Sequence, residues 1–176
     1  MPGCSHRPPH SYTIERAIST DAAMILDFLA QAGGESNNLS FGSEGLPFSV
    51  DAEASYLAQI QDSANEIMLV AKLNGKIIGT ASLNRLPRRM GHRGDLSVSV
   101  AKAYWNQGIG SNLLSDIIEF ARSHDFDAID LQVRSDNRSA IHLYEKFGFQ
   151  KIGTHPTFFK INGDEIPADI MLLILK

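Results

Sequence analysis

The most informative stretch of the sequence reads Trp105-Asn106-Gln107-Gly108-Ile109-Gly110-Ser111-Asn112-Leu113-Leu114. Before it stands Leu96-Ser97-Val98-Ser99-Val100, whose strict alternation of apolar and polar residues predicts a strand. After the loop, apolar residues recur at helical spacing, namely Ile109, Leu113, Leu114, Ile117, Ile118 and Ala121. The sequence therefore predicts a strand, a glycine-bracketed loop and a helix, in that order.

Such a junction is suited to hold phosphate. The first N–H groups of a helix have no partner within the helix and carry the positive end of its dipole, so an anion binds there. Gly108 and Gly110 let the anion reach the main chain. A dinucleotide-binding loop would need a third glycine and a Walker A loop would need Gly-Lys-Ser/Thr, and both are absent from this stretch.

A second pattern comes after a strand-like segment at 128–133 and reads Asn137-Arg138-Ser139-Ala140-Ile141-His142-Leu143-Tyr144-Glu145-Lys146-Phe147-Gly148-Phe149. Together the two segments resemble the GCN5-related N-acetyltransferase (GNAT) superfamily, whose members transfer an acetyl group from acetyl-CoA to an amine. In that family a V-x-V strand precedes a Q/R-x-x-G-x-G/A loop, and N-x-x-A-x-x-x-Y-x-x-x-G-F comes later. Every anchor of the second pattern is present here at the same spacing, whereas Trp105 stands at the Gln/Arg position of the first.

The resemblance implies how acetyl-CoA would bind. Main-chain groups of Val98, Ser99 and Val100 would contact the pantetheine arm where two strands splay apart. Asn137 would orient the pantetheine, cap the helix after it, or do both. The diphosphate would bind the backbone amides of Trp105, Asn106, Gln107, Gly108, Ile109, Gly110 and Ser111.

Direct transfer needs a neutral amine, donors for the developing oxyanion and an acid for the departing thiolate. Tyr144 matches the general acid of the family, and a half-buried structural aromatic is the alternative interpretation. The amide of Ser99 or Val100 is the candidate oxyanion donor. Asp95, at the start of the cofactor strand, is the candidate general base, although a solvated acid at a strand end explains it equally well.

Glu35 and Glu44 lie on a long polar, glycine-rich stretch and are candidates to attract a cationic acceptor, or else ordinary surface acids. The acceptor is then a small-molecule amine or a peptide amine, and the sequence does not distinguish them. Two alternatives stay open. One is transfer of another acyl group from CoA; the other is a catalytically silent acyl-CoA-binding sensor or interaction module.

Length, charge and composition narrow the number of domains, the binding partners and the location that we expect for this protein. The 176 residues suit one domain, which we place at 12–176 after a leader at 1–11 that we expect to be flexible. The net charge of −4 argues against binding to nucleic acid or to a membrane surface. The sequence lacks a long apolar stretch and a secretory signal and has one cysteine, so we expect a cytoplasmic protein. His6 and His10 in the leader lack companion ligands, and we expect no metal.

These patterns predict a fold class that is α/β of the α+β type. We expect a GNAT-like, mixed and largely antiparallel central sheet of about six to seven strands, with helices on both faces. Asn74-Gly75 and Asn162-Gly163 predict two hairpins, and Gly33-Gly34 predicts the end of the first helix. The apolar last strand, 170–175, pairs within its own sheet or across a homodimer.

Overall fold

The computed structural model describes residues 11–176. The predicted leader, with His6 and His10, lies outside the described residues except for Ser11. Short 3-10 turns stand before α1, β4 and α3. The strands and helices are β1 (Thr13–Arg16), α1 (Ala22–Glu35), α2 (Val50–Ile60), β2 (Glu66–Leu73), β3 (Lys76–Arg85), β4 (Arg93–Val100), α3 (Ile109–Ser123), β5 (Ala128–Arg134), α4 (Arg138–Lys146), β6 (Gln150–Ile161) and β7 (Asp164–Ile174).

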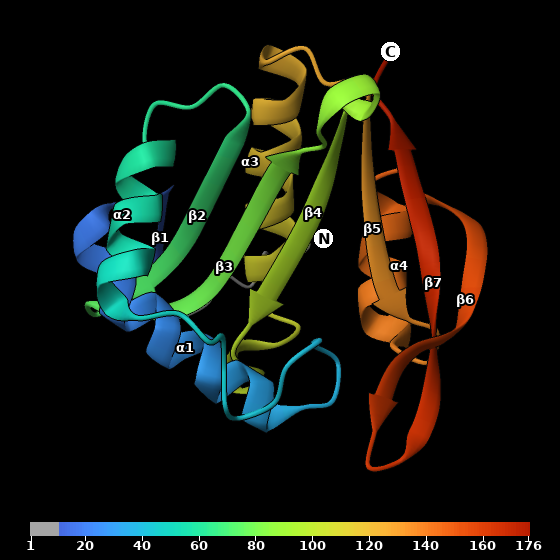
Figure 1. The fold of residues 1–176 in the computed structure, drawn as a ribbon, viewed down its shortest axis with the longest axis horizontal. Helices are drawn as coiled ribbons and strands as arrows, with labels where there is room; N and C mark the ends of the chain where they lie inside the picture. Colours follow the sequence, from blue (N-terminus) through green and yellow to red (C-terminus); the bar gives the residue numbers. More distant parts are fainter. Residues whose placement is uncertain (1–10) are drawn as a thin grey trace, which may run out of the picture.

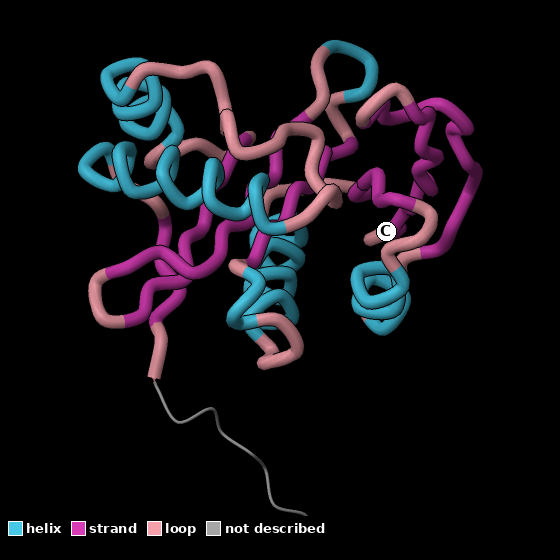
Figure 2. The backbone as a smooth tube through the Cα atoms, turned by 90° about the horizontal axis from the view of Figure 1, so that it is seen from below, coloured by secondary structure: helices cyan, strands magenta, loops and turns pink. Residues whose placement is uncertain are grey.

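The strands form one seven-stranded sheet in the order β1-β2-β3-β4-β5-β7-β6. Only β4 and β5 pair in parallel, and every other neighbouring pair is antiparallel. Helices α1 and α2 cover one face of the sheet, which we call the front face, and α3 and α4 cover the opposite, back face (Figures 1 and 2). The predicted fold class is confirmed.

Each face of the sheet has its own apolar core. On the back face, Leu113, Leu114 and Ile117 of α3 are fully buried against strand residues such as Leu83 and Leu96. On the front face, residues of α1 and α2 pack against Val70 and Ile77. Successive side chains of a strand point to opposite faces. Because Leu96, Val98 and Val100 of β4 pack in the back core, Asp95, Ser97 and Ser99 point to the front face.

The two predicted hairpins are confirmed. Asn74 and Gly75 connect β2 to β3, and Asn162 and Gly163 connect β6 to β7. All four residues have positive φ, at 50° and 76° in the first turn and 53° and 90° in the second. Positive φ at both central positions is the geometry of a type I′ turn, which matches the twist of the paired strands.

The predicted end of the first helix at Gly33-Gly34 is wrong, because α1 continues to Glu35. Gly33 is needed for the packing of the loop on α1 and not for the end of the helix. A Cβ atom at this position would lie 2.1 Å from the carbonyl oxygen of Gly42, so only glycine lets the loop after α1 pack directly on the helix. This contact holds the 36–49 segment against α1.

The last strand lies inside the sheet. β7 pairs with β5 on one side and with β6 on the other. Of the two interpretations of its apolar sequence, burial in its own sheet is confirmed, and a homodimer stays a prediction. Among residues 11–176, no helix is long and apolar enough to cross a membrane.

Candidate active site

The site begins where β4 and β5 separate. Their parallel register covers only Arg93↔Ala128, Gly94↔Ile129 and Asp95↔Asp130, and beyond Asp95 the strands diverge (Figure 1). β4 stays paired with β3 along its full length. The second half of β4 therefore has one edge without a neighbouring strand, and this edge faces a V-shaped gap.

Alternation of the backbone hydrogen bonds decides which β4 groups face the gap. The amide of Ala101 donates to the carbonyl of Ile78 at 2.9 Å, on the β3 side. In an antiparallel ladder the main-chain groups of successive residues point to opposite edges. Ser99 therefore belongs to the β3 ladder, whereas Val98 and Val100 face the gap. Of the two predicted oxyanion donors, only Val100 has the required direction, and Ser99 is removed from the predicted main-chain contacts.

The loop after β4 supplies free amides at the mouth of the gap. Gly108 caps α3 with φ +84° and ψ −2°, and no side chain caps the helix. Within the described chain, none of the backbone amides from Asn106 to Ser111 donates to a protein acceptor; the first helical bond runs from Asn112 to the carbonyl of Gly108. The Trp105 amide differs from the prediction, because it donates to Lys102 at 3.2 Å.

Two side-chain features fix the position of this loop. The Trp105 indole Nε1 donates to the carbonyl of Val100 at 2.7 Å and so ties the loop to the end of β4. Gly110 lies against α4, since a Cβ atom there would be 3.3 Å from Leu143 Cδ2. The glycine thus brings the N-terminus of α3 close to α4.

Helix α4 and its N-cap carry the two residues of the second motif that have predicted roles, Tyr144 and Asn137. The Asn137 side chain accepts a hydrogen bond from the Ala140 amide at 3.2 Å, so the helix-cap role is confirmed. Tyr144 is 8% exposed, lies in the back core with Leu96 and Val133, and packs against Phe149 with ring centroids 5.7 Å apart. Burial raises the pKa of Tyr144 to about 12, so its phenol is protonated at neutral pH.

Asp95 lies on the other side of the sheet, at the apex of the gap. Burial is the largest cause that raises the pKa of Asp95, and the nearby charge of Asp130 adds to it. A hydrogen bond from Gln132 and the charge of Arg93 oppose the rise. Asp130 itself is 5% exposed and accepts a 2.7 Å hydrogen bond from Arg93 Nε. Asp95 is thus the acid beside the gap that has no ion-pair partner among the described residues.

The predicted acceptor-binding acids accept hydrogen bonds from other groups of the protein. Glu35 accepts hydrogen bonds from the Lys102 amide at 2.6 Å and from Gln31 at 2.8 Å. Glu44 accepts one from the Gly42 amide at 2.8 Å, and backbone hydrogen bonds lower its pKa. Glu35 therefore ties the end of α1 to the turn after β4, and Glu44 stabilises a turn within the 36–49 loop. Acceptor binding by them stays a prediction.

Sequence reasoning missed three polar residues of the front face. Glu53 and Tyr56 come from α2, and Asn84 of β3 stands opposite Asp95 in the sheet. Tyr56 donates to Asn84 Oδ1 at 3.3 Å. A signal existed in the sequence, because Glu53 precedes Leu57 and Ile60 by one and two helical turns and so lies on the apolar side of α2.

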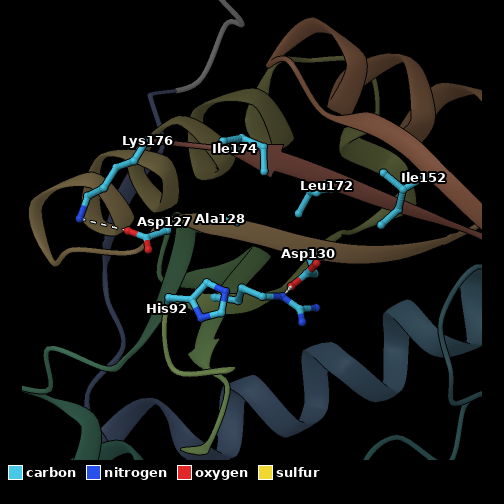
Figure 3. Close-up of a pocket in the computed structure, with 9 residues that line it drawn as sticks. His92, Asp127, Ala128, Asp130, Ile152, Leu172, Ile174 and Lys176 are labelled. Atoms are coloured by element: carbon cyan, nitrogen blue, oxygen red, sulfur yellow. Dashed lines mark hydrogen bonds and ion pairs between the residues drawn. The ribbon is translucent and has the colours of Figure 1, made fainter. Parts of the chain in front are cut away.

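An open pocket of about 450 Å³ adjoins Asp130 and is lined by residues of β5, β6 and β7 and by His92 and Arg93 at the start of β4 (Figure 3). Apolar side chains of Ile152, Leu172 and Ile174 line one part of it, and His92 lines another. Lys176 and Asp127 form an ion pair of 3.1 Å at its edge. Both carboxylates that line this pocket, Asp127 and Asp130, are thus paired with cations.

Comparison with known proteins identifies similar chains. Residues 38–149 match the family described as Acetyltransferase (GNAT) family. The N-alpha-acetyltransferase RimI of Mycobacterium tuberculosis is 33% identical over 94 residues, which cover 53% of this chain and 58% of that protein. The L-amino acid N-acetyltransferase AaaT of Escherichia coli is 34% identical over 106 residues, which cover 58% of this chain and 65% of that protein. The chain thus matches these curated relatives over less than two thirds of their length.

Solved structures match over almost the whole chain. An acetyltransferase of the GNAT family from Streptococcus pneumoniae has a TM-score of 0.90 and 32% identity, covering 94% of this chain and 100% of that one. YncA, a putative acetyltransferase from Salmonella typhimurium solved with its cofactor acetyl-CoA, has a TM-score of 0.82, covering 94% and 95% of the two chains. At 23% identity, the second likeness concerns the fold alone.

Proposed function

Since the chain belongs to the GNAT family of acetyltransferases, we propose that it transfers an acetyl group from acetyl-CoA to a primary amine by direct attack. One observation carries the proposal. A gap between β4 and β5 has free main-chain groups along one edge, unpaired amides at its mouth and a protonated tyrosine behind it. These are the parts that binding of a thioester and departure of a thiolate require.

The residues present fit acetyl-CoA as a co-substrate. The amides from Asn106 to Ser111 would bind the diphosphate at the N-terminus of α3. The main-chain groups of Val98 would pair with the pantetheine amides, as a neighbouring strand would. The Val100 carbonyl already accepts from Trp105, and the Val100 amide, which faces the gap, is the donor for the thioester oxygen. The missing Gln/Arg of the family motif matters little to contacts that the backbone makes.

The proposed reaction uses the two faces of the sheet separately. Tyr144 belongs to the back core, so the thiol end of the co-substrate lies toward that side, and the amine approaches from the front face past Asp95. The amine nitrogen attacks the thioester carbon; a C–N bond forms and the C–S bond breaks. Asp95 accepts the proton that the nitrogen loses, and Tyr144 gives a proton to the thiolate, so protons balance.

Burial supports the roles of Asp95 as the base and of Tyr144 as the acid. A carboxyl whose pKa is raised holds a proton more readily than an ordinary aspartate, which suits a base near neutral pH. Tyr144 stays a phenol until well above neutral pH, so the acid is present in its protonated form. The acceptor is a small-molecule or peptide amine. The names of the relatives include an L-amino acid N-acetyltransferase and an N-alpha-acetyltransferase.

Replacing Tyr144 by Phe tests the mechanism. The change keeps the ring and its packing and removes only the hydroxyl. We expect kcat to fall about 100-fold, the lower end of the usual contribution of general acid catalysis, while the dissociation constant of acetyl-CoA measured by calorimetry stays the same. Thiol release gives the rate.

The other outcomes separate the alternatives. A variant as active as the parent would show that Tyr144 is not the acid. A parent protein that binds acetyl-CoA but acetylates no amine would be a silent binding module, and better turnover with a longer acyl-CoA would indicate another acyl group. Folded protein without affinity for acetyl-CoA, with NAD and ATP as controls, would contradict the whole proposal.

A further inference from the structure

Glu53 is a buried carboxylate that the structure leaves without a partner. The residue is 5% exposed, and within residues 11–176 its side chain makes no hydrogen bond or ion pair. Only Arg85 Nε is both sealed from solvent and without a hydrogen bond in that part of the chain. The Glu53 oxygens therefore keep some contact with solvent. An isolated carboxylate at such a place is costly unless something binds it.

The surroundings of Glu53 offer acceptors and negative charge. Tyr56 lies one helical turn further along α2, and its hydroxyl hydrogen is already used in the bond to Asn84 Oδ1. The pKa of Tyr56 is raised to about 12, first by burial and then by the charges of Glu66 and Glu53. No cation acts on this hydroxyl among the described residues. A ligand that satisfies the group must therefore bring donors and positive charge.

Glu53 and the polar residues around it lie beside Asp95, where we place the transfer of the acetyl group. In the sheet, Glu66 stands opposite Asn84, Asn84 opposite Asp95, and Asp95 opposite Asp130, so four neighbouring strands place these polar side chains in one row. Paired residues on neighbouring strands are about 5.5 Å apart between Cα atoms. Tyr56 donates to Asn84 Oδ1 at 3.3 Å, and Asn84 is the residue that pairs with Asp95, so the hydroxyl is one strand spacing from the proposed base. Met68 of β2 is half-buried on the same face.

We propose that Glu53, with Tyr56, Asn84 and Glu66, binds a second ammonium group of the acceptor, so that the acceptor class is an aliphatic diamine or polyamine. The inference rests on the proposed function for the position of the reacting amine. One ammonium lies at Glu53, the methylene chain crosses Asn84, and the other nitrogen reaches Asp95 at the gap. In the pocket of Figure 3, both lining carboxylates already have cationic partners, since Asp130 pairs with Arg93 and Asp127 pairs with Lys176, so neither is free to bind a second ammonium.

Binding of putrescine and butylamine, measured by calorimetry in the presence of CoA, tests the inference without relying on turnover. The two amines have the same carbon chain, and only putrescine has a second ammonium. We expect putrescine to bind the parent at least tenfold more tightly than butylamine. In Glu53→Gln, which keeps the side-chain shape, we expect the affinity for putrescine to fall to that for butylamine. Tyr56→Phe, a second variant on the same helix, should weaken putrescine binding and leave butylamine unchanged.

Asp127→Asn is the matched control, since it removes a carboxylate that lines the pocket of Figure 3. It should leave putrescine binding unchanged. Equal affinities of the parent for the two amines, no binding of putrescine, or unchanged binding in Glu53→Gln would each overturn the second-cation site. Failure of the proposed function is distinct, because it would show as absent acetyl-CoA binding or absent acetyl transfer to any amine.

Discussion

Burial changes the acid–base chemistry of individual side chains on both sides of the gap. It raises the pKa of Tyr144 on the back face and of Glu53 on the front face. For the phenol the consequence is favourable, since it stays protonated and able to act as an acid. For the carboxyl the consequence is a cost, because the charged form must exist in a poorly solvated place at neutral pH.

Glu53→Gln should therefore stabilise the free protein near neutral pH. The folded state holds the Glu53 proton more tightly than the unfolded state. Stability from this group is complete below its ordinary pKa of 4.5 and is lost as pH rises through the folded value. Glutamine is not subject to this loss. The variant should have the larger free energy of unfolding in urea at about pH 7.5, and the difference should vanish near about pH 4.

Parent and variant share all other titrating groups, so their difference isolates Glu53. A variant less stable than the parent at neutral pH would mean that the carboxylate has a favourable partner in the free protein. That result would remove the reason for expecting a cation there.

At the scale of one element, the N-terminus of α3 depends on the backbone conformation of its cap. Gly108 has φ +84°, and open space surrounds the position of a Cβ atom. Gly75 in the β2–β3 turn shares both properties, with φ +76°. The two glycines differ in the segment that each one begins. Gly108 leads into the row of free amides, whereas Gly75 leads into a hairpin strand.

Gly108→Ala and Gly75→Ala should each cost about 1–2 kcal/mol of stability, the usual penalty for a left-handed non-glycine residue. Only Gly108→Ala should weaken acetyl-CoA binding, because relief of its strain reorients the amides of the loop. Calorimetry gives the affinity, and Trp105, the single tryptophan of the chain, gives a fluorescence signal in the loop itself. Equal loss of affinity in both variants would argue against diphosphate binding at α3.

In the molecule as a whole, the end of α1 and the residues that follow it connect the two sides of the gap. On the β4 side, Glu35 accepts from the Lys102 amide. On the β5 side, Arg134 Nη1 donates to the Asn37 carbonyl at 2.9 Å. Arg134 also binds Asp136 at 2.7 Å, which holds the guanidinium in place. Residues 35–37 thus connect the β4 side of the gap to its β5 side, and we call them the strap.

Arg134→Gln should release the β5 end of this strap. A hydrogen bond from a charged donor is worth about 1.5–3 kcal/mol, so we expect the KM of the acceptor to rise about tenfold and hydrogen exchange of residues 36–49 to accelerate. The KM of acetyl-CoA should stay the same. Asp136→Asn is the control, because it removes the ion pair and keeps the bond to Asn37. If both variants behave alike, the ion pair and not the strap controls the acceptor side.

Local signals account for the parts of the site that the sequence predicted. The alternation of 96–100, the two Asn-Gly turns and the Asn137 cap each depend on residues a few positions apart. Tyr144 could be singled out because the spacing of its motif is contained in one helix and its flanking turns. The prediction for Gly33-Gly34 was wrong because its reason, the approach of Gly42, comes from a residue beyond the helix.

Residues close together in the sequence were enough to predict the strands, the helices and the proposed roles of the loop before α3 and of α4, since backbone propensities and short spacings act within a segment. Three-dimensional packing was needed to show that Ser99 bonds to β3 while Val100 faces the gap, and that Glu35 bonds to the Lys102 amide. It also decided that Glu53, Tyr56, Asn84 and Asp95 meet on the front face. The physical reason is that strand pairing and helix packing join residues far apart in the chain, and burial then sets the charge state of the groups that they bring together.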